Sequence, residues 1–259
     1  MIQTKAKILK NTLIKNNFFH CVISASEIAR KAYPGQFINV KINDSLTPLL
    51  RRPFSVYNTQ GERVEFIYEA VGEGTRLLSK RKKGEYLDLI GPLGNGFRIN
   101  SSPDSENILV AGGIGVAPLF FLARKLAKKK RGILVFLGAK TKKEILCKEE
   151  FKRLGCKIEM ATDDGSLGFK GKITELFKSQ IKNINCKVST LYACGPRPML
   201  KEICLIAQKY NLLSQISLEE HMACGLGLCL GCVVKTRSGY KKVCSDGPVF
   251  EGQEIIWEG

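Results

Sequence analysis

The sequence predicts an α/β domain joined to an all-β domain: an N-terminal antiparallel β-barrel, a middle domain with a parallel sheet, and a cysteine-rich C-terminal region. Three observations support this. The length of 259 residues suits one large or two ordinary domains, at about 150 residues each. The spacing of apolar residues changes near position 100, from short strands to alternating strands and helices. Four of the ten cysteines lie within positions 224–244.

The first hundred residues contain short runs rich in Val, Ile, Phe and Tyr, separated by turn residues. Runs at this spacing predict an antiparallel barrel or sandwich. We expect strands at 5–14, 18–24, 36–41, 54–58, 64–70 and 86–90, and one short helix at 75–83. These elements make up the predicted first domain, residues 1–100.

A polar run with a proline at 100–106 predicts a linker. After it, apolar strands alternate with helical segments, which predicts a parallel sheet with helices on both faces. We expect strands at 108–111, 133–138, 157–162 and 191–194, and helices at 118–130, 144–154, 173–182 and 198–210. The predicted second domain is 101–216, and the third region, 217–259, contains the clustered cysteines.

The composition, 44% hydrophobic and 25% charged residues, is that of a globular protein. The longest uncharged apolar stretch, 108–123, contains glycines and a proline and is shorter than the roughly 20 residues of a membrane span. The first residues do not resemble a signal peptide, because no apolar segment precedes a small-residue cleavage site. We therefore expect a cytoplasmic protein without a membrane span.

The net charge is +17, from 41 Lys and Arg against 24 Asp and Glu. A charge of this size is typical of proteins that bind nucleic acid or other anions, and also of proteins with solvated basic faces. The lysines form separate clusters at 80–83, 128–131, 140–143 and 241–242, without aromatic residues among them. We favour solvated faces, which can still attract an acidic protein or a phosphorylated cofactor.

The C-terminal cysteines Cys224, Cys229, Cys232 and Cys244 follow the spacing C-x4-C-x2-C-x11-C. The C-x4-C-x2-C pattern with a later fourth cysteine is that of plant-type 2Fe–2S proteins. Glycines at 225, 227 and 231 allow the backbone to approach a cluster closely. A structural zinc site normally contains two C-x2-C pairs, and only one is present here. The spacing therefore predicts a 2Fe–2S cluster, with zinc as the alternative.

Two segments of the first domain carry groups suited to a phosphorylated cofactor. Residues 51–55 read RRPFS, and residues 72–75 read GEGT at the start of a helix. A helix start preceded by glycine leaves N–H groups available to a phosphate. Thr75 adds a hydroxyl, and Arg52 adds a charge-assisted contact.

The second domain opens with the glycine turn AGGIGVAP at 111–118, between a strand and a helix. This turn is not the G-x-G-x-x-G fingerprint, and no acidic residue stands at the tip of the next strand, 138–140. The strand end ACGP at 193–196 lies on the same predicted sheet edge, where open α/β sheets bind ligands. Asp163 and Asp164 follow a further strand, and we interpret them as turn residues rather than as paired carboxylates for acid–base catalysis.

In order and spacing, RRPFS, GEGT, GPLGNGF at 91–97, AGGIGVAP, TDDGS at 162–166 and ACGP resemble the ferredoxin–NADP⁺ reductase superfamily. With the C-terminal cysteines, the whole chain resembles the electron-transfer subunits of two-subunit, NAD-dependent (class 1B) dihydroorotate dehydrogenases. This resemblance makes the four clustered cysteines the cluster ligands. It implies FAD contacts from Arg52, Pro53, Phe54, Ser55, Ile67, Tyr68, Glu69, Gly74 and Thr75, and NAD contacts from Gly112, Gly113, Gly115 and Cys194. Position 69 is often basic in relatives, so with Glu69 the implied contact is made by the backbone.

The resemblance also implies a role as an oxidoreductase subunit in pyrimidine biosynthesis. Electrons would pass from the FMN of a dihydroorotate-oxidising partner through the 2Fe–2S cluster and FAD to NAD⁺, in a heterotetramer of two of each subunit. No residue is assigned a catalytic role, because cofactors carry the redox chemistry. The alternatives are the small subunit of an NADH-dependent ferredoxin:NADP⁺ oxidoreductase or of a sulfide dehydrogenase, and, from another class, a zinc-bearing nucleic-acid-binding protein.

The remaining chemically active residues have simpler interpretations. His20 and His221 are the only histidines and lack a metal-binding spacing, so we interpret His20 as a barrel residue. Cys194 lies near the nicotinamide or is a small buried thiol. No serine nucleophile has a plausible histidine partner, which excludes a hydrolase of that type. Lysines at 140, 142 and 143 would attract the 2′-phosphate of NADP but lack the arginine fork, so we expect NAD.

Overall fold

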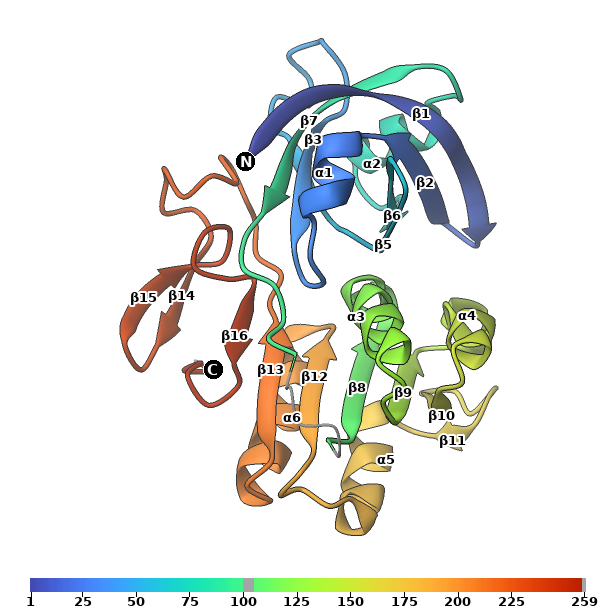
Figure 1. Cartoon of the computed structure of the whole chain (residues 1–259), viewed down its shortest axis with the longest axis vertical. Helices are drawn as coiled ribbons and strands as arrows, with labels where there is room; N and C mark the ends of the chain where they lie inside the picture. The colour runs from blue at the N-terminus through green and yellow to red at the C-terminus, as the bar shows by residue number, and fades with distance from the viewer. Residues whose placement is uncertain (100–104, 258–259) are drawn as a thin grey trace.

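The computed structural model describes residues 1–99 and 105–257. Among these residues the strands form two seven-stranded sheets and a two-stranded hairpin, and the two sheets lie one above the other in Figure 1. The domain boundary predicted at residues 100 and 101 lies outside the described residues. In the described part of the chain, no helix is long and apolar enough to cross a membrane.

The first sheet is antiparallel and curls into a half-barrel (Figure 1). More and less buried residues alternate along β1 (Ile2–Lys15) and β7 (Tyr86–Leu93), as at Ala6 and Ile8, because neighbouring side chains point to opposite faces. The short helix α1 (Ser26–Lys31) buries Ile28 and Ala29 in the same core, and α2 (Glu73–Ser79) follows β6. In sheet order the strands are β4 (Arg52–Ser55), β3 (Phe37–Lys41), β7 (Tyr86–Leu93), β1 (Ile2–Lys15), β2 (Phe18–Ser24), β6 (Arg63–Glu69) and β5 (Asn58–Gln60).

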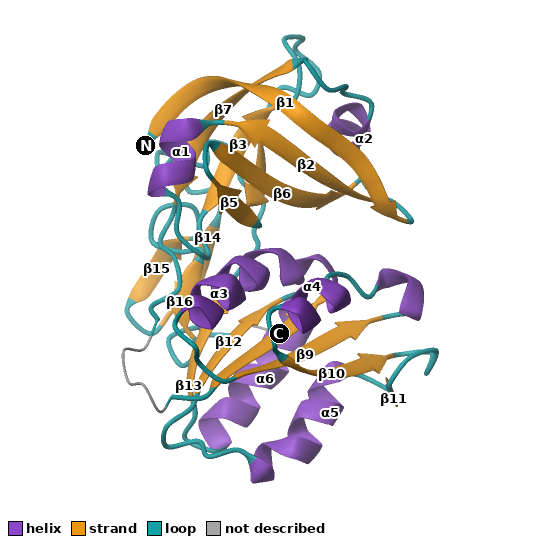
Figure 2. Cartoon of the chain, turned by 45° about the vertical axis from the view of Figure 1, so that its right-hand side comes forward, coloured by secondary structure: helices purple, strands orange, loops and turns teal. Residues whose placement is uncertain are grey.

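The second sheet is parallel except at the described edge strand β16, and helices cover both of its faces (Figure 2). Helices α3 and α4 pack on one face, and α5 and α6 pack on the other. In sheet order the strands are β11 (Phe169–Lys170), β10 (Lys157–Thr162), β9 (Ile133–Ala139), β8 (Asn107–Gly112), β12 (Thr190–Cys194), β13 (Leu213–Ser217) and β16 (Val249–Glu251). The helices are α3 (Val116–Lys128), α4 (Lys148–Arg153), α5 (Ile173–Gln180) and α6 (Arg197–Lys209), with single turns η1 (Gly113–Gly115), η2 (Lys142–Glu144) and η3 (Ile181–Asn183).

The C-terminal region lies beside both sheets (Figure 1). Its hairpin consists of β14 (Val233–Thr236) and β15 (Gly239–Lys242). The predicted GPLGNGF segment joins this region to the first sheet through Asn95. The Asn95 N–H donates to Gly247 O at 2.6 Å, and its Nδ2 donates to the carbonyls of Ser245 and Asp246 at 3.1 and 2.9 Å.

Several elements differ from the sequence prediction. The expected strand 54–58 is two strands, because β4 hydrogen-bonds to β3 while β5 hydrogen-bonds to β6 at the opposite edge of the sheet. The expected helix 144–154 is divided into η2 and α4, with Cys147 at φ 60° before α4. The helix α1, the hairpin and the strands β13 and β16 were not expected.

Strand β13 escaped prediction because its sequence, LSQIS, contains a buried glutamine. The amide of Gln215 hydrogen-bonds to both backbone groups of Arg98: the Arg98 N–H donates to Oε1 at 2.7 Å, and Nε2 donates to Arg98 O at 2.9 Å. A polar residue is tolerated inside the sheet because both of its groups are hydrogen-bonded. These two hydrogen bonds also attach the chain to β13 where it leaves the first domain.

Candidate functional site

The four clustered cysteines form two pairs of neighbouring thiols. The Sγ atoms of Cys224 and Cys229 are 3.3 Å apart. Cys232 and Cys244 are both buried, their side chains interact, and the Cys244 N–H points at Cys232 Sγ at 3.5 Å. Among the described residues, no three His, Cys, Asp or Glu side chains are arranged around a single ion. Four cysteines arranged as two thiol pairs suit a cluster with two irons, each held by two cysteines. They suit a single tetrahedral zinc ion less well.

Backbone N–H groups of the loop point at the thiol sulfurs. Gly227 N–H donates to Cys244 Sγ at 3.1 Å, and Leu226 and Cys229 donate to Cys224 Sγ at 3.4 and 3.5 Å. Burial acts to raise the pKa of Cys224, but these backbone donors outweigh it and lower the pKa to about 6. Because the thiolate is the metal-binding form, the loop is preorganised for a metal centre.

The cluster loop, residues 222–232, is fixed to the first sheet through Asn39 of β3. Asn39 Nδ2 donates to Cys224 O at 3.2 Å, and a Cβ added at Gly225 would lie 2.4 Å from that Nδ2. Gly225 also has φ +67°, so this position requires glycine. By contrast, Leu228 and Leu230 on either side of Cys229 are 84% and 74% exposed. The loop therefore places a cysteine between two exposed apolar side chains.

A cleft of about 510 Å³ opens at the carboxyl ends of the parallel strands. Gly112 and Gly113 line it after β8, Asp163 lines it after β10, and Phe18 and Glu69 line it from the first domain. This is the edge at which open α/β sheets bind nucleotides. Of the three lysines considered for NADP binding, Lys140 alone is among the described residues that line the cleft.

Gly115 and Cys194 lie behind the wall of this cleft rather than on it. A Cβ added at Gly115 would lie 2.3 Å from Cys194 O, so the glycine allows the turn to pack directly on β12. Cys194 is 1% exposed. Burial raises the pKa of its thiol well above the usual range, and the charge of Glu219 raises it further.

Two carboxylates in the cleft were missed by the sequence interpretation. Glu219 follows the unexpected strand β13, and the cleft walls raise its pKa by desolvation even though its side chain also reaches solvent. Asp163 follows β10 and lies in a turn, as expected, and its N–H donates to Ala139 O at 3.1 Å, which attaches this turn to the tip of β9. The neighbouring Asp164 is indeed a turn residue, because its Oδ1 accepts from Ser166 N and Oγ at 2.9 and 2.6 Å.

The predicted FAD-binding residues divide between the barrel core and its surface. Phe54 and Tyr68 are buried in the core with ring centroids 5.6 Å apart, and Ile67 is buried between the two domains. Arg52, Pro53 and Ser55 are partly exposed. Within the described residues the Ser55 hydroxyl makes no hydrogen bond, which leaves it available to a ligand.

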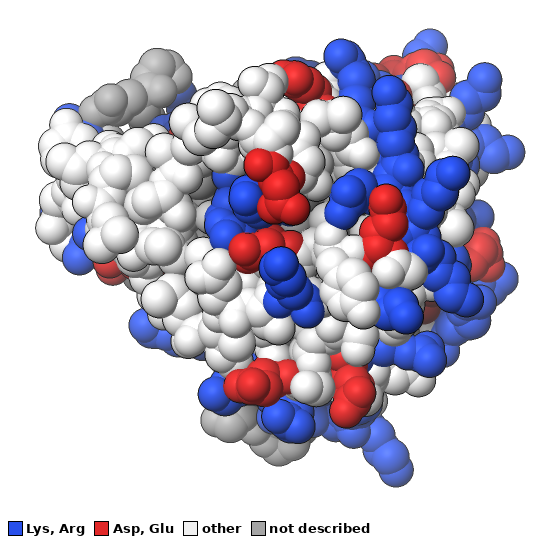
Figure 3. Space-filling model, turned by 90° about the horizontal axis from the view of Figure 1, so that it is seen from above, with Lys and Arg blue, Asp and Glu red and all other residues white. Residues whose placement is uncertain are grey.

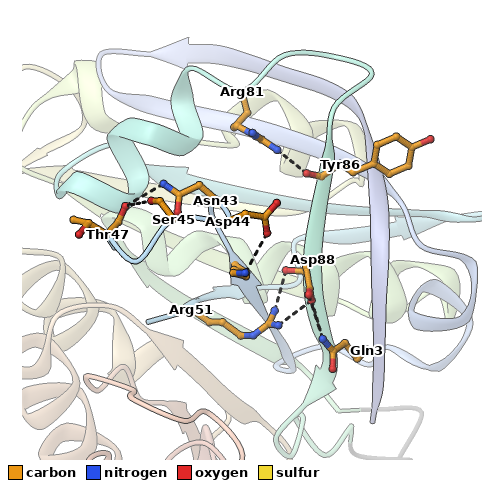
Figure 4. Close-up of polar contacts among 10 residues, drawn as sticks. Gln3, Asn43, Asp44, Ser45, Thr47, Arg51, Arg81, Tyr86 and Asp88 are labelled. Carbon is orange, nitrogen blue, oxygen red and sulfur yellow. Dashed lines mark hydrogen bonds and ion pairs between the residues drawn. The ribbon is translucent and has the colours of Figure 1, made fainter. Parts of the chain in front are cut away.

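The two arginines of the RRPFS motif point to different places. Arg51 forms a two-point contact with Asp88 of β7: Nη2 to Oδ1 and Nη1 to the carbonyl oxygen, both at 2.9 Å (Figure 4). Gln3 of β1 donates to the same carboxylate at 3.2 Å (Figure 4). Arg51 therefore anchors the start of β4 to the sheet.

Arg52 instead lies against α2. Its Nη1 donates to Leu50 O at 2.7 Å, and a Cβ added at Gly74 would lie 3.1 Å from its Nε. The Thr75 hydroxyl is used inside the turn, where it accepts from the N–H groups of Val71 and Gly72 at 3.0 and 3.1 Å. The side chain of Arg52 is thus a cationic group at the turn that precedes α2, together with Arg76, whose Nη2 donates to Val71 O at 2.9 Å.

Comparison with known protein families matches two regions of the chain, the middle domain and the C-terminal region. Residues 219–256 match the model of the iron-sulfur cluster binding domain of dihydroorotate dehydrogenase B, and residues 109–205 match that of the oxidoreductase NAD-binding domain. Two proteins named dihydroorotate dehydrogenase B (NAD(+)), electron transfer subunit are similar over nearly their whole length. The one from Desulforamulus reducens is 40% identical, with 98% of each chain covered, and the one from Geobacillus kaustophilus is 39% identical, with 96% of each covered.

Solved structures give the same fold. The NADH-dependent reduced ferredoxin-NADP oxidoreductase structure superimposes with a TM-score of 0.87 and 30% identity, covering 97% of this chain and 90% of that one. The ferredoxin NADP⁺ reductase of Neisseria gonorrhoeae, solved with bound FAD and NADP, has a TM-score of 0.70 at 18% identity, covering 80% of this chain and 91% of that one. The second likeness concerns the fold alone.

Proposed function

The chain belongs to the family of dihydroorotate dehydrogenase B electron transfer subunits. We propose that it passes electrons from the FMN of a dihydroorotate-oxidising partner to NAD⁺, and we propose which of its residues hold the cofactors that carry them. The chain is an oxidoreductase subunit with FAD, a 2Fe–2S cluster and NAD as cofactors. When bound, FAD exchanges a hydride with NAD(H) and single electrons with the cluster. The protein's own residues bind these groups, orient them and exclude water.

Cys224, Cys229, Cys232 and Cys244 hold the cluster. The observation that carries this assignment is the pairing of their thiols under N–H donors of the same loop. Because backbone donors stabilise thiolates, the loop can hold the negatively charged ligands without a basic side chain. Leu228 and Leu230 are exposed in the isolated chain. They shield the cluster from solvent once a partner packs on them.

FAD lies along β4, β6 and α2. Arg52 would supply the charge for the pyrophosphate, and the free Ser55 hydroxyl would hydrogen-bond to the reactive part of the flavin. Phe54 and Tyr68 contribute backbone contacts, because their rings fill the barrel core. The remaining contacts come from Pro53, Ile67, Glu69, Gly74 and Thr75.

Replacing Arg52 by Ala tests this assignment. Loss of one charge-assisted hydrogen bond should weaken FAD binding roughly tenfold or more, while the cluster content stays unchanged. Equilibrium dialysis of FAD against the variant, with Arg63→Ala at an exposed position of β6 as control, measures the change. Wild-type FAD affinity in Arg52→Ala would remove Arg52 from the site.

NAD lies in the cleft at the carboxyl ends of β8 and β12, against Gly112 and Gly113. Gly115 and Cys194 support the glycine turn from behind. The Asp163 carboxylate accepts hydrogen bonds from a ribose, the role that an acidic residue at the second strand plays in other nucleotide-binding sheets. The neighbouring Asp164 is held in its turn and does not take part.

The partner is the FMN-containing catalytic subunit, docked on the exposed leucines of the cluster loop in a heterotetramer. Exposed apolar side chains on both sides of a cluster ligand support this site. Replacing Leu228 and Leu230 by Ser should weaken assembly without loss of cluster or FAD. Nucleic acid is not a partner in this proposal, and the cytoplasmic location stays a prediction.

The deciding experiment isolates the native complex and assays dihydroorotate:NAD⁺ activity. Flavin bands with cluster absorption and this activity support the proposal. Oxidation of NADPH or sulfide by the complex would instead favour the relatives considered from the sequence. A colourless zinc protein would contradict the whole account.

A further inference from the structure

A second cleft, of about 690 Å³, separates the first domain from helices α3 and α4. It lies between the outer faces of β1, β5 and β6 on one side and Phe120, Arg124 and Cys147 on the other. Side chains bridge the domains around the cleft: Tyr57 and Ile67 pack in one apolar cluster with α3, and Lys15 Nζ donates to the carbonyls of Lys142 and Ile145 at 3.2 and 3.3 Å. The relative orientation of the domains on this side therefore depends on individual side chains.

One continuous polar chain crosses this gap. Arg124 of α3 donates from Nη1 to Asn58 Oδ1, and Asn58 Nδ2 donates to Glu65 Oε1 at 2.7 Å. The other carboxylate oxygen of Glu65 contacts His20 Nε2 at 2.8 Å. Asn58 is only 6% exposed, so its amide is oriented on one side by the barrel and on the other by Arg124.

An aromatic contact supports the same crossing point. The rings of Tyr57 and Phe120 stack with centroids 4.6 Å apart and planes 15° from parallel. Tyr57 precedes Asn58, and Phe120 lies one helical turn before Arg124 on α3. Two adjacent residues of the first domain thus contact one face of α3.

Helix α3 connects this contact to the nucleotide cleft. The glycine turn η1 leads directly into α3, and Arg124 lies about 12 Å along the helix from Val116, at 1.5 Å per residue. A helix of this length moves as a rigid body, so a tilt of the helix at Arg124 also moves the glycine turn that lines the NAD cleft. Hydride exchange is sensitive to such shifts, since a misplacement of about 1 Å can cost about a hundredfold in rate.

We propose that Arg124 and Asn58 form an interdomain clamp that orients the nucleotide domain towards the flavin strands and so positions NAD for hydride exchange. They are positioning residues, because they lie outside the NAD cleft. The inference rests on the proposed function, which places FAD on the first domain and NAD on the second.

The test replaces Arg124 by Met in the assembled complex, which keeps the apolar stem and removes the donor. Anaerobic stopped-flow absorbance should show flavin reduction by NADH slowed about tenfold, with the dissociation constant of NAD⁺ changed by no more than about twofold. Independently of activity, hydrogen exchange of backbone amides at 58–60 and 113–118 should accelerate. Lys128→Met, at an exposed position of the same helix, is the control and should change none of these quantities.

A double-mutant cycle separates a clamp from general stabilisation. Asn58→Ala alone should slow flavin reduction, and the double variant should be no slower than the slower single variant, because one bond is lost in all three. Arg124→Lys retains a donor and should restore part of the rate, which also covers the case in which Arg124→Met does not fold.

Two results would overturn the clamp: wild-type rates of flavin reduction in a folded Arg124→Met complex, or additive effects in the double variant. Loss of thermal stability with an unchanged rate would show a merely structural contact. If the wild-type flavin itself is not reduced by NADH, the proposed function fails instead.

Discussion

Cys229 lies between two exposed leucines, yet its Sγ is 3.3 Å from that of Cys224. Replacing Cys229 by Ser should weaken or abolish cluster assembly, because an alkoxide is a harder and poorer ligand for iron than a thiolate. Iron and acid-labile sulfide content, with the visible spectrum, measure the loss. FAD should remain bound, because its proposed site is on β4, β6 and α2.

The matched control is Cys186→Ser. Cys186 is also partly exposed but lies outside the cluster loop, so this variant should keep its iron. Full cluster content in Cys229→Ser would remove Cys229 from the ligand set.

The roles of some single residues could be predicted from the sequence, and the roles of others could not. Cysteine ligands are recognisable because the cluster imposes their spacing along one loop. Asp163 was not recognised as a cleft residue, because it reaches the tip of β9 only through hydrogen bonds between two strands. The sequence interpretation had sought an acid on the second strand itself, whereas Asp163 lines the cleft after the third.

At the scale of elements, β13 depends on Gln215. Replacing Gln215 by Leu leaves the Arg98 N–H without its partner, while Arg98 O keeps only the Tyr192 hydroxyl, at 3.2 Å. This loss should lower the free energy of unfolding by roughly 1–3 kcal/mol. Urea-induced unfolding of the purified chain measures this. Leu213→Ala, at a 61% exposed position of the same strand, should have a much smaller effect. Equal midpoints for the two variants would contradict the buried role of the amide.

The contact between β2 and β6 predicts a pH dependence. Burial acts to raise the pKa of Glu65, but hydrogen bonds from His20 and Asn58 dominate and lower it below its ordinary value of 4.5. The unfolded chain therefore binds the proton more readily than the folded chain. The resulting stability is fully present above about pH 4.5 and is lost as the pH falls through the lowered folded pKa.

The corresponding variant is Glu65→Gln. Its melting temperature should lie below that of wild type near neutral pH, and the difference should shrink as the pH falls below about 4.5. Glu62→Gln, at an exposed position, should follow the wild-type curve. Parallel melting curves for wild type and Glu65→Gln at all pH values would show that the hydrogen bonds to the Glu65 carboxylate contribute nothing.

Elements were predictable where burial repeats with a regular period. The strands β8 and β12 are buried along their whole length, so their apolar runs were visible in the sequence. The helix α1 and the hairpin β14–β15 are short, and their residues are mostly polar. Such elements form only because neighbouring elements pack on them, which local sequence does not encode.

At the scale of the whole molecule, the positive charge is distributed unevenly over the face seen from above (Figure 3). Figure 3 shows Lys and Arg side chains gathered along one side of the face seen from above, with Asp and Glu among them. Ion pairs such as Lys41–Asp44 and Arg81–Glu85 are exposed and contribute little to stability. This distribution is consistent with the solvated basic faces expected from the separate lysine clusters.

The nucleotide cleft also belongs to the whole molecule, because residues of both domains line it. Within it, the Asp163 carboxylate would repel the 2′-phosphate of NADP, while Lys140 attracts it through space. Salt screens both charges, because Asp163 and Lys140 are both exposed and the Debye length is about 10 Å at 0.1 M. The ratio of kcat/KM for NADH over NADPH should therefore exceed one at low ionic strength and fall towards one at moderate ionic strength.

Diaphorase assays at the two salt concentrations measure this ratio. Asp163→Asn should lower it by roughly fivefold, corresponding to about 1 kcal/mol of repulsion between partly solvated charges. Asp164→Asn is the matched control, because its carboxylate is bound within the turn, and its ratio should stay at the wild-type value. A wild-type ratio well below one at both salts would contradict the preference for NAD, because repulsion by Asp163 would then be weaker than attraction by Lys140.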